Sequence, residues 1–174
     1  MEVEVNKTKA LEILETYYHG PVKYAKAVLE RWPLSNGLVV YKTGRPAGAE
    51  IFYRVDLAQP TCVHYYLIVA PQFQRQGVAT YLANKVGEIC GAEVFLATTT
   101  VENMAAVGLF KKLGYMVYRW PELPRKVRDV LLKATCGYDD DILFIKGAEP
   151  TQVAKPTAEV QKLWRETCLL PYFS

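Results

Sequence analysis

Histidine and cysteine, the residues that most often bind zinc, are scarce in this sequence. Its 174 residues include two histidines, His19 and His64, which are too few for a histidine-rich metal site. The four cysteines lie far apart, with no C-x-x-C pair, at positions 62, 90, 136 and 168. This spacing excludes a zinc ribbon and gives no disulfide framework. We therefore expect no metal site, and we expect Cys62 and Cys90, which lie in apolar stretches, to be unreactive core thiols.

Long hydrophobic runs and strong net charge are also missing. The N-terminus, MEVEVNKTK, lacks the apolar segment of a signal peptide, and no apolar run approaches membrane-spanning length. We therefore expect a cytoplasmic protein with no membrane partner. The net charge of +3 is mild and dispersed. It suits an anionic cofactor but is too small to indicate nucleic acid binding.

Internal repeats and low-complexity segments are absent as well. With 51% hydrophobic and 22% charged residues, the composition is that of a globular protein. A chain of 174 residues has room for one domain with a sizeable core. We expect this domain to span residues 1–147, followed by a linker and a short helix in residues 148–174.

Hydrophobic periodicity predicts helices and strands that alternate in the second half of the chain. The expected strands are 2–5, 37–41, 47–55, 62–69, 93–100, 115–120 and 142–145. The expected helices are 8–18, 21–32, 77–89, 103–113, 125–134 and 157–168. Antiparallel strands followed by helix–strand pairs indicate an α/β fold with a mixed, mostly antiparallel central sheet flanked by helices.

The most informative stretch is CVHYYLIVAPQFQRQGVA, residues 62–79. Its apolar half predicts a buried strand that Pro71 ends, and a helical pattern begins at Gly77 after a polar loop. The first amides of a helix have no partners within it and carry the positive end of its dipole, so this arrangement can bind an anion. Gly77 and Ala79 let a ligand approach the main chain closely. An ordinary strand-to-helix connection is the alternative.

Two motifs carry a resemblance to a known family. The loop QRQGVA (residues 74–79) is similar to the Q/R-x-x-G-x-G/A loop of the GCN5-related N-acetyltransferases. The block NMAAVGLFKKLGY (residues 103–115) resembles the N-x-x-A-x-x-L-Y-x-x-x-G-F pattern that follows the fifth strand in that family. Either motif alone is weak, but together they occur in the family's order, with one helix and one strand between them. The resemblance covers residues 39–146.

The resemblance implies that acetyl-coenzyme A binds as a co-substrate. In this family the fourth and fifth strands splay apart, and the acyl-pantetheine arm lies between them like an added strand. The loop amides then hold the pyrophosphate, with Arg75 as a charge partner. The cofactor-binding residues expected on this basis are Leu67, Ile68, Val69, Gln74, Arg75, Gln76, Gly77, Val78, Ala79, Asn103 and Phe110.

Acetyl transfer to an amine needs a neutral amine and a group that protonates the leaving thiolate. Strict alternation along the strand places His64 on the face opposite to Tyr65, and thus out of phase with the expected site unless a bulge intervenes. The imidazole of His64 is chemically suited to act as a base. Tyr65 occupies a position where relatives often carry glutamate, which favours a role in positioning the substrate.

The thiolate acid is the point where the sequence departs from the family. The family pattern has tyrosine where this chain has Phe110, and phenylalanine cannot donate a proton. Three alternatives replace the missing acid: a water molecule, the hydroxyl of Tyr115, or release of an unprotonated thiolate that the helix N-terminus stabilises. The candidate catalytic residues are therefore His64, Tyr65 and Tyr115.

The interpretation we favour is an N-acetyltransferase that moves an acetyl group from acetyl-CoA directly to a primary amine of a peptide, a protein or a metabolite. A non-catalytic acyl-CoA-binding module is the alternative, and Phe110 favours it. A protein-interaction domain that uses the C-terminal helix is a third. The expected partners are acetyl-CoA and an amine acceptor, with no nucleic acid; the sequence leaves open whether the protein is a homodimer.

Other polar residues have both a functional and a structural interpretation. The threonines at 98–100 either bond the substrate or simply form a strand. Asn103 either caps its helix or binds the pantetheine arm. Lys111 and Lys112 either contact a cofactor phosphate or form a solvated helix face. The aspartates at 139–141 either attract a cationic amine or form a turn.

Overall fold

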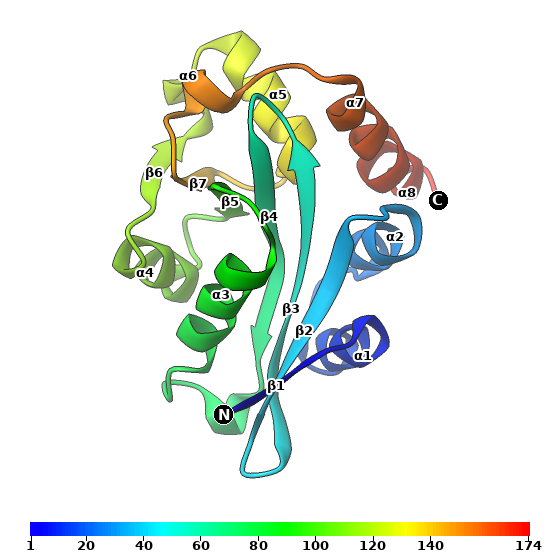
Figure 1. Ribbon diagram of the computed structural model, residues 1–174, viewed down its shortest axis with the longest axis vertical. Coiled ribbons are helices and arrows are strands. Elements are labelled where there is room, and N and C mark those ends of the chain that lie inside the picture. Colours follow the sequence, from blue (N-terminus) through cyan, green and yellow to red (C-terminus); the bar gives the residue numbers. More distant parts are fainter.

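Seven strands form one sheet in the computed structural model, which describes residues 1–174 (Figure 1). Their spatial order is β1-β2-β3-β4-β5-β7-β6. The strands are β1 (Glu2–Val5), β2 (Ser35–Lys42), β3 (Arg45–Asp56), β4 (Pro60–Val69), β5 (Val94–Thr99), β6 (Met116–Arg119) and β7 (Ile142–Lys146). Only β4 and β5 pair in parallel, and the other neighbours are antiparallel. The expected α/β fold with a mixed, mostly antiparallel sheet is confirmed.

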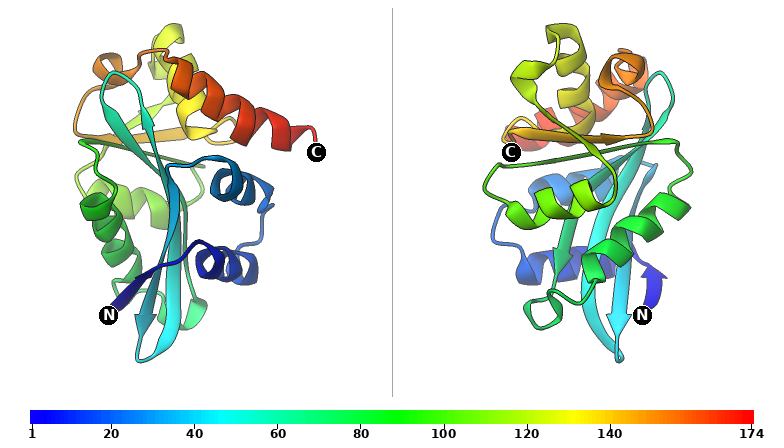
Figure 2. Two further views of the ribbon diagram at one scale, coloured as in Figure 1. Left: turned by 45° about the vertical axis from the view of Figure 1, so that its right-hand side comes forward. Right: turned by 90° about the vertical axis from the view of Figure 1, so that its left-hand side faces the viewer.

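Helices cover both faces of the sheet. The helices are α1 (Lys7–Tyr17), α2 (Lys23–Arg31), α3 (Val78–Ile89), α4 (Met104–Lys112), α5 (Arg125–Thr135), α6 (Pro150–Val153), α7 (Ala158–Trp164) and α8 (Leu170–Tyr172). Figures 1 and 2 show α1 and α2 on one face and α3 and α4 on the other. A π turn, Arg165–Leu169, joins α7 to α8, so that the C-terminal segment continues to a position beside α2. Sequence periodicity did not reveal α6, which lies in the expected linker and buries Val153 completely.

The larger hydrophobic core lies between the sheet and the helices α1, α2, α5 and α7. On α1, Ala10, Ile13 and Leu14 recur at helical spacing and are buried in this core. Complete burial of a leucine or isoleucine side chain contributes about 1.5–3 kcal/mol to the stability of the fold. A smaller core lies under α3, where Leu82 and Val86 pack against the opposite face of the sheet. The two cores fix the sheet between its helical layers and thereby fix the ends of β4 and β5.

The sheet divides between β4 and β5. The two strands pair only from Thr61–Val94 to His64–Ala97, although both continue beyond this point. Beyond the last pair, β5 and β7 run across the direction of β2, β3 and β4 (Figure 2). The part of β4 after His64 therefore has an edge that β5 does not cover, as the resemblance implied.

A β-bulge interrupts β4 at the same point. Phe52 of β3 is paired with His64 and Ile51 is paired with Tyr66, so Tyr65 is the extra residue. The strict alternation expected along this strand is therefore wrong. Leu67 and Val69 pack under α3 together with Cys62, while Tyr65 and Tyr66 both pack toward the larger core. The bulge thus brings His64 into phase with the cofactor-facing residues.

Two disulfide bonds correct the expectations that the cysteines form no disulfide framework and that Cys62 and Cys90 are core thiols. Cys62 of β4 is bonded to Cys90 at the end of α3, and Cys136 after α5 is bonded to Cys168 in the C-terminal segment. The partners are separated by 28 and 32 residues. Sequence spacing could not reveal these pairs because packing of elements distant in the chain brings them together.

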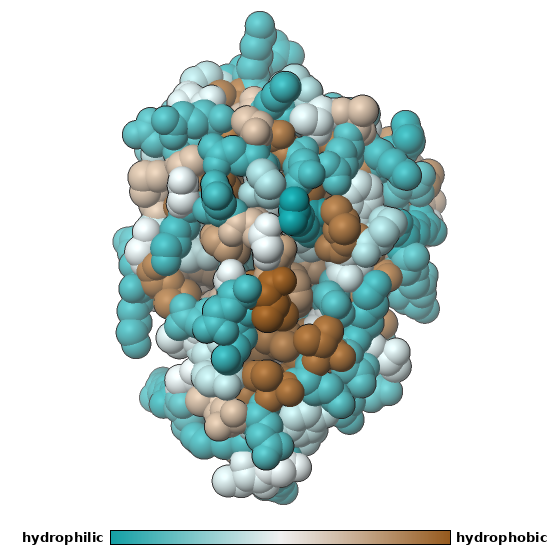
Figure 3. Space-filling view, in the orientation of Figure 1, coloured by the Kyte–Doolittle hydropathy of each residue, from teal (hydrophilic) through white to brown (hydrophobic).

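The surface is mixed in polarity. On the face shown in Figure 3, hydrophobic side chains form separate patches near the centre and in the lower half, and hydrophilic side chains cover most of the remainder. The strand β1 lies in the lower half of this view, and its Val3 and Val5 are exposed. No helix combines the length and the apolar character needed to cross a membrane.

Candidate active site

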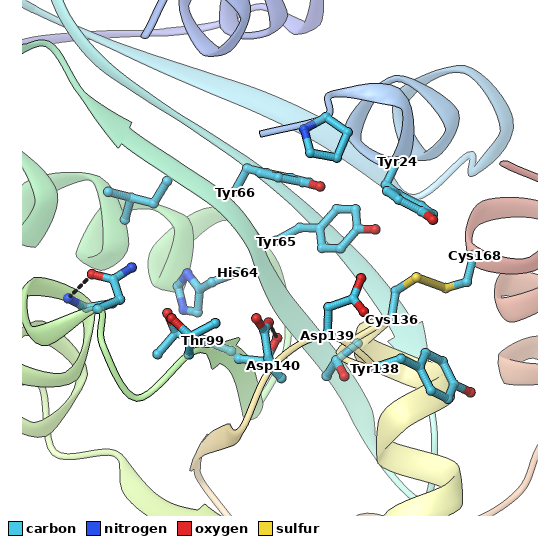
Figure 4. Close-up of a pocket in the computed structure, with 18 of the residues that line it drawn as sticks. Tyr24, His64, Tyr65, Tyr66, Thr99, Cys136, Tyr138, Asp139, Asp140 and Cys168 are labelled. Carbon is cyan, nitrogen blue, oxygen red and sulfur yellow. Dashed lines mark hydrogen bonds between the residues drawn. A yellow bond between two sulfur atoms is a disulfide. The ribbon is translucent and has the colours of Figure 1, made fainter. Parts of the chain in front are cut away.

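A cavity of about 800 Å³ opens where β4 and β5 separate. Residues of both strands line it, together with residues of α4, the segment around α2, the loop before β7 and the C-terminal segment. Figure 4 shows Tyr24, Tyr65 and Tyr66 on one side of this cavity and Tyr138, Asp139 and Asp140 on the other. Elements from the whole length of the chain therefore build one site.

The loop between β4 and α3 has the backbone geometry that the sequence indicates. A 3₁₀ turn, Pro71–Phe73, follows β4, and Gly77 caps α3 with a left-handed φ of +81°. A Cβ atom at Gly77 would meet no atom within 4 Å, so the space beside the main chain is open. Arg75 is also left-handed, with φ of +62°. The loop thus presents the N-terminus of a twelve-residue helix next to the free edge of β4.

The other residues expected to bind the cofactor lie in different surroundings. Leu67, Asn103 and Phe110 line the cavity, whereas Ile68 packs toward the larger core. The Asn103 side chain accepts a hydrogen bond from the amide of Ala106 at 3.1 Å, so it caps α4. The Gln76 side chain is held by Lys42, whose Nζ donates to Oε1 at 2.6 Å.

His64 lies between two partners. Its Nδ1 is 2.5 Å from Oε2 of Glu50, and its Nε2 is 2.7 Å from the hydroxyl of Tyr115. His64 is 5% exposed and Glu50 is completely buried. A carboxylate can only accept hydrogen bonds, so Nδ1–H donates to Glu50. The Nε2 atom of a neutral imidazole then accepts a hydrogen bond from the Tyr115 hydroxyl. This chain of hydrogen bonds brings together His64 and Tyr115, two of the three candidate catalytic residues.

Tyr115 and Phe110 complete the surroundings of the imidazole. Burial, and then the charge of Glu50, raises the pKa of Tyr115 above its ordinary value of 10.0, so the phenol stays protonated at neutral pH. Phe110 is 6% exposed, and its ring centroid lies 5.5 Å from that of His64 and 5.0 Å from that of Tyr115. The phenol hydroxyl missing at position 110 is therefore present on the neighbouring ring.

Sequence reasoning missed Glu50. It comes from β3, where the stretch AGAEIFY (residues 47–53) is otherwise apolar apart from one phenol. A charged residue inside a strand that is predicted to be buried was a usable signal, because carboxylates are rarely buried without a partner. Oε1 of Glu50 has no hydrogen-bond partner, so the carboxylate is held through His64 alone.

The sequence also matches a family model. The Acetyltransferase (GNAT) family model matches residues 7–115, well over half of the chain. The chain belongs to the GNAT acetyltransferase family. Acyl transfer from coenzyme A is therefore the chemistry that this membership supports. The β4–α3 loop and the separation of β4 from β5 are the features that the sequence resemblance led us to expect.

Solved structures of GNAT acetyltransferases share the fold. The ribosomal-protein-S18-alanine N-acetyltransferase of Escherichia coli is 16% identical, with a TM-score of 0.59 over 91% of this chain and 96% of that one. An acetyltransferase of Bacillus subtilis in complex with CoA is 12% identical, with a TM-score of 0.60 over 85% and 99%. An IAA acetyltransferase of Bacillus cereus is 16% identical, with a TM-score of 0.56 over 67% and 77%. Identities this low show the fold alone. No curated protein sequence matches this GNAT chain significantly.

The Cys136–Cys168 bond ties the C-terminal wall of this GNAT cavity to the end of α5. We expect Cys168→Ser to lower the unfolding free energy by about 2–4 kcal/mol, as is typical for loss of a disulfide. Because the C-terminal segment would then move more freely, KM for the acceptor should rise while the affinity for CoA stays the same. Thermal unfolding, limited proteolysis and steady-state kinetics measure these three effects.

Cys90→Ser is the matched control, since it removes the other disulfide without touching the C-terminal wall. It should cost similar stability but leave KM for the acceptor unchanged. Equal KM changes in the two variants would show that the C-terminal bond has no separate effect on the cavity.

Proposed function

We propose that the protein is an N-acetyltransferase that moves the acetyl group of acetyl-CoA directly to a primary amine. The observation that carries the proposal is the position of the Glu50–His64–Tyr115 chain at the point where β4 and β5 separate. In a GNAT fold, this point is where the thioester and the amine have to meet. A proton-handling group at that position is what acyl transfer to an amine requires.

The residues present fit acetyl-CoA as the co-substrate, which supplies an acetyl group activated as a thioester. The free edge of β4, from Tyr65 to Val69, offers backbone groups to the amides of the pantetheine arm. The amides at the start of α3 and the positive end of its dipole suit the pyrophosphate. Gly77 leaves the space beside these amides open, and Arg75 adds a positive charge in the same loop.

His64 is the proposed base. It borders the cavity, and once the Tyr115 hydroxyl turns its proton away from Nε2, this nitrogen accepts the proton that the ammonium group loses, directly or through water, while Glu50 stabilises the resulting imidazolium. Tyr115 is the proposed acid for the thiolate, because its phenol stays protonated and is hydrogen-bonded to His64. His64 then returns a proton to Tyr115, which resets the chain of hydrogen bonds. The bulged residue, Tyr65, positions the acceptor rather than transferring a proton.

A non-catalytic acyl-CoA-binding module is the second candidate, and Phe110 favours it. Steady-state assays with acetyl-CoA and a panel of amines, read as release of free thiol, separate the two functions. We expect amine-dependent thiol release together with a product that has gained the mass of an acetyl group. Tight CoA binding by calorimetry with no acetylated product from any amine would support the binding module.

Tyr115→Phe tests the assignment of the acid. It removes the hydroxyl and keeps the ring, so kcat should fall by about 10²-fold, within the usual range for general acid catalysis. The double variant Phe110→Tyr/Tyr115→Phe places a hydroxyl on the adjacent ring, where the family pattern has one. We expect it to recover part of the lost kcat, and kinetics at saturating acetyl-CoA measure the recovery. An unchanged kcat in Tyr115→Phe would assign the thiolate acid elsewhere.

The cytoplasmic location expected from the sequence stays a prediction. Two disulfides are typical of oxidising compartments, and also of intracellular proteins of hyperthermophiles. Labelling of thiols in protein taken directly from its source cells distinguishes bonded from reduced cysteines in that compartment.

A further inference from the structure

The acceptor side of the cavity is lined with aromatic rings. Six of the twelve tyrosines of the chain line the cavity, and Trp164 adds a further ring. Tyr65 and Tyr66 are consecutive residues, yet both rings pack on the same side of the sheet because of the bulge at Tyr65. Their centroids are 4.7 Å apart with an interplanar angle of 69°, so the two rings form a corner (Figure 4). Such a corner presents π surfaces in two directions to one ligand.

The charge of the cavity is negative and uncompensated. Asp139 and Asp140 line it, and no lysine or arginine does, although the chain has 21 basic and 18 acidic residues. Neither aspartate forms an ion pair. The Asp140 carboxylate accepts a hydrogen bond from the Thr98 hydroxyl at 2.6 Å, which orients the carboxylate without neutralising it. The cavity thus supplies a site for a positive charge and contains none of its own.

The two aspartates and the tyrosine rings line the same cavity and influence one another electrostatically. Burial, followed by the neighbouring phenols and Asp140, raises the pKa of Tyr65 and of Tyr66. Burial and then Asp139 raise the pKa of Tyr24 in the same way. All three phenols therefore stay neutral at neutral pH and keep π faces that attract a cation. A ligand carboxylate in this space would meet two like charges and no basic partner.

The far wall of the cavity comes from the C-terminal segment. Trp164, Leu169 and Tyr172 line it, and the Cys136–Cys168 bond fastens this segment to the end of α5 (Figure 4). A cavity walled by a tethered segment suits a small molecule better than an extended peptide, which needs an open groove.

We propose that the acceptor is a small primary amine that binds as an ammonium cation, has an aromatic or aliphatic body and carries no carboxylate. This inference rests on the proposed acetyl transfer and names its substrate class. The ammonium lies between the tyrosine rings and Asp140, and the apolar body packs against the remaining rings. After the ammonium loses one proton to His64, its nitrogen bonds to the acetyl carbon, the carbon–sulfur bond breaks, and the nitrogen releases a second proton to solvent. The thiolate takes up one proton. The tyrosine rings and Asp140 together form a cation cage. The amide product is neutral, so it loses its attraction to this cage and leaves.

Binding of an inert cation tests the cage without any turnover. Phenethyltrimethylammonium has no N–H to acetylate, and calorimetry in the presence of CoA gives its Kd. Asp140→Asn should weaken its binding roughly five- to tenfold, because one charge close to the cation is removed. The matched control is Asp141→Asn, which removes the adjacent charge outside the cavity and keeps the oxygen that accepts from the Val101 amide. It should change Kd less than about twofold, as expected for an exposed charge.

Turnover of matched amines tests the substrate class. Phenethylamine and phenylalanine differ only by a carboxylate, and a short peptide provides an N-terminus on a longer chain. We expect kcat/KM for phenethylamine to exceed that for phenylalanine by about 100-fold, because the phenylalanine carboxylate would meet unpaired like charges. We expect a difference of about 100-fold for the peptide as well, because an extended chain needs an open groove.

Acetylation of phenylalanine or the peptide in preference to phenethylamine would overturn this inference and leave the N-acetyltransferase assignment intact. Equal binding of the quaternary cation by wild type and Asp140→Asn would overturn it as well. If CoA binds but no amine is acetylated, the proposed function fails, and the calorimetric comparison still decides whether the cage selects cations.

Discussion

Glu50→Gln is expected to lower kcat by about 10²–10⁴-fold, the usual range for loss of acid–base catalysis. Glutamine has nearly the same shape but no charge, so the imidazolium of His64 would lose the carboxylate 2.5 Å from its Nδ1. Stability should be unchanged or increased, because burying a carboxylate with one unpartnered oxygen is unfavourable. Kinetics with saturating acetyl-CoA, together with thermal unfolding, measure both effects.

The pairing of lost activity with retained stability distinguishes a catalytic carboxylate from a structural one. A structural role would make Glu50→Gln less stable and leave kcat within a few-fold of wild type. Because Glu50 and His64 act as a unit, His64→Asn combined with Glu50→Gln should cost little more than the worse single variant. Fully additive losses would show that the two side chains act separately.

Gly77→Glu should abolish detectable CoA binding, with an affinity at least about 100-fold weaker. The new side chain would add bulk and a negative charge where the loop is expected to hold the pyrophosphate. Gly77 has φ of +81°, so any other residue is also strained there, by roughly 1–2 kcal/mol. The fold should survive this cost, since a Cβ at Gly77 meets no neighbouring atom. Calorimetry with CoA and a circular dichroism spectrum test the two statements.

Gly91→Glu is the control for both strain and charge. Gly91 is also left-handed, with φ of +71°, but it follows α3 at the opposite end, roughly 18 Å from Gly77 along a twelve-residue helix. This variant should lose similar stability and keep CoA affinity within about twofold, because the charge is distant and screened. Unchanged CoA affinity in a folded Gly77→Glu would contradict the assignment of the loop.

Local patterns in the sequence were enough to predict the elements and the loop that joins β4 to α3. Apolar residues at a period of 3.6 or 2 predicted nearly every helix and strand, because burial of one face is a local requirement. Gly77 was recognisable for the same reason, since its left-handed conformation depends on its own backbone. Capping was one of two alternatives for Asn103, and it could be foreseen because a cap bonds to an amide three residues later in the same chain segment. The two motifs in their correct order then indicated the family.

The side chains that meet at the site could be identified from the three-dimensional packing alone. The bulge at Tyr65 arises from a shift in the register between β3 and β4. It places His64 on the same face as Leu67 and Val69, which strict alternation had assigned to opposite faces. Glu50 reaches His64 from the neighbouring strand β3, and Tyr115 reaches it from 51 residues further along the chain. The disulfides and the tyrosine-lined cavity likewise join segments that lie far apart in sequence. Local periodicity fixes which face of an element is buried, but strand register and helix packing fix which residues of two buried faces touch.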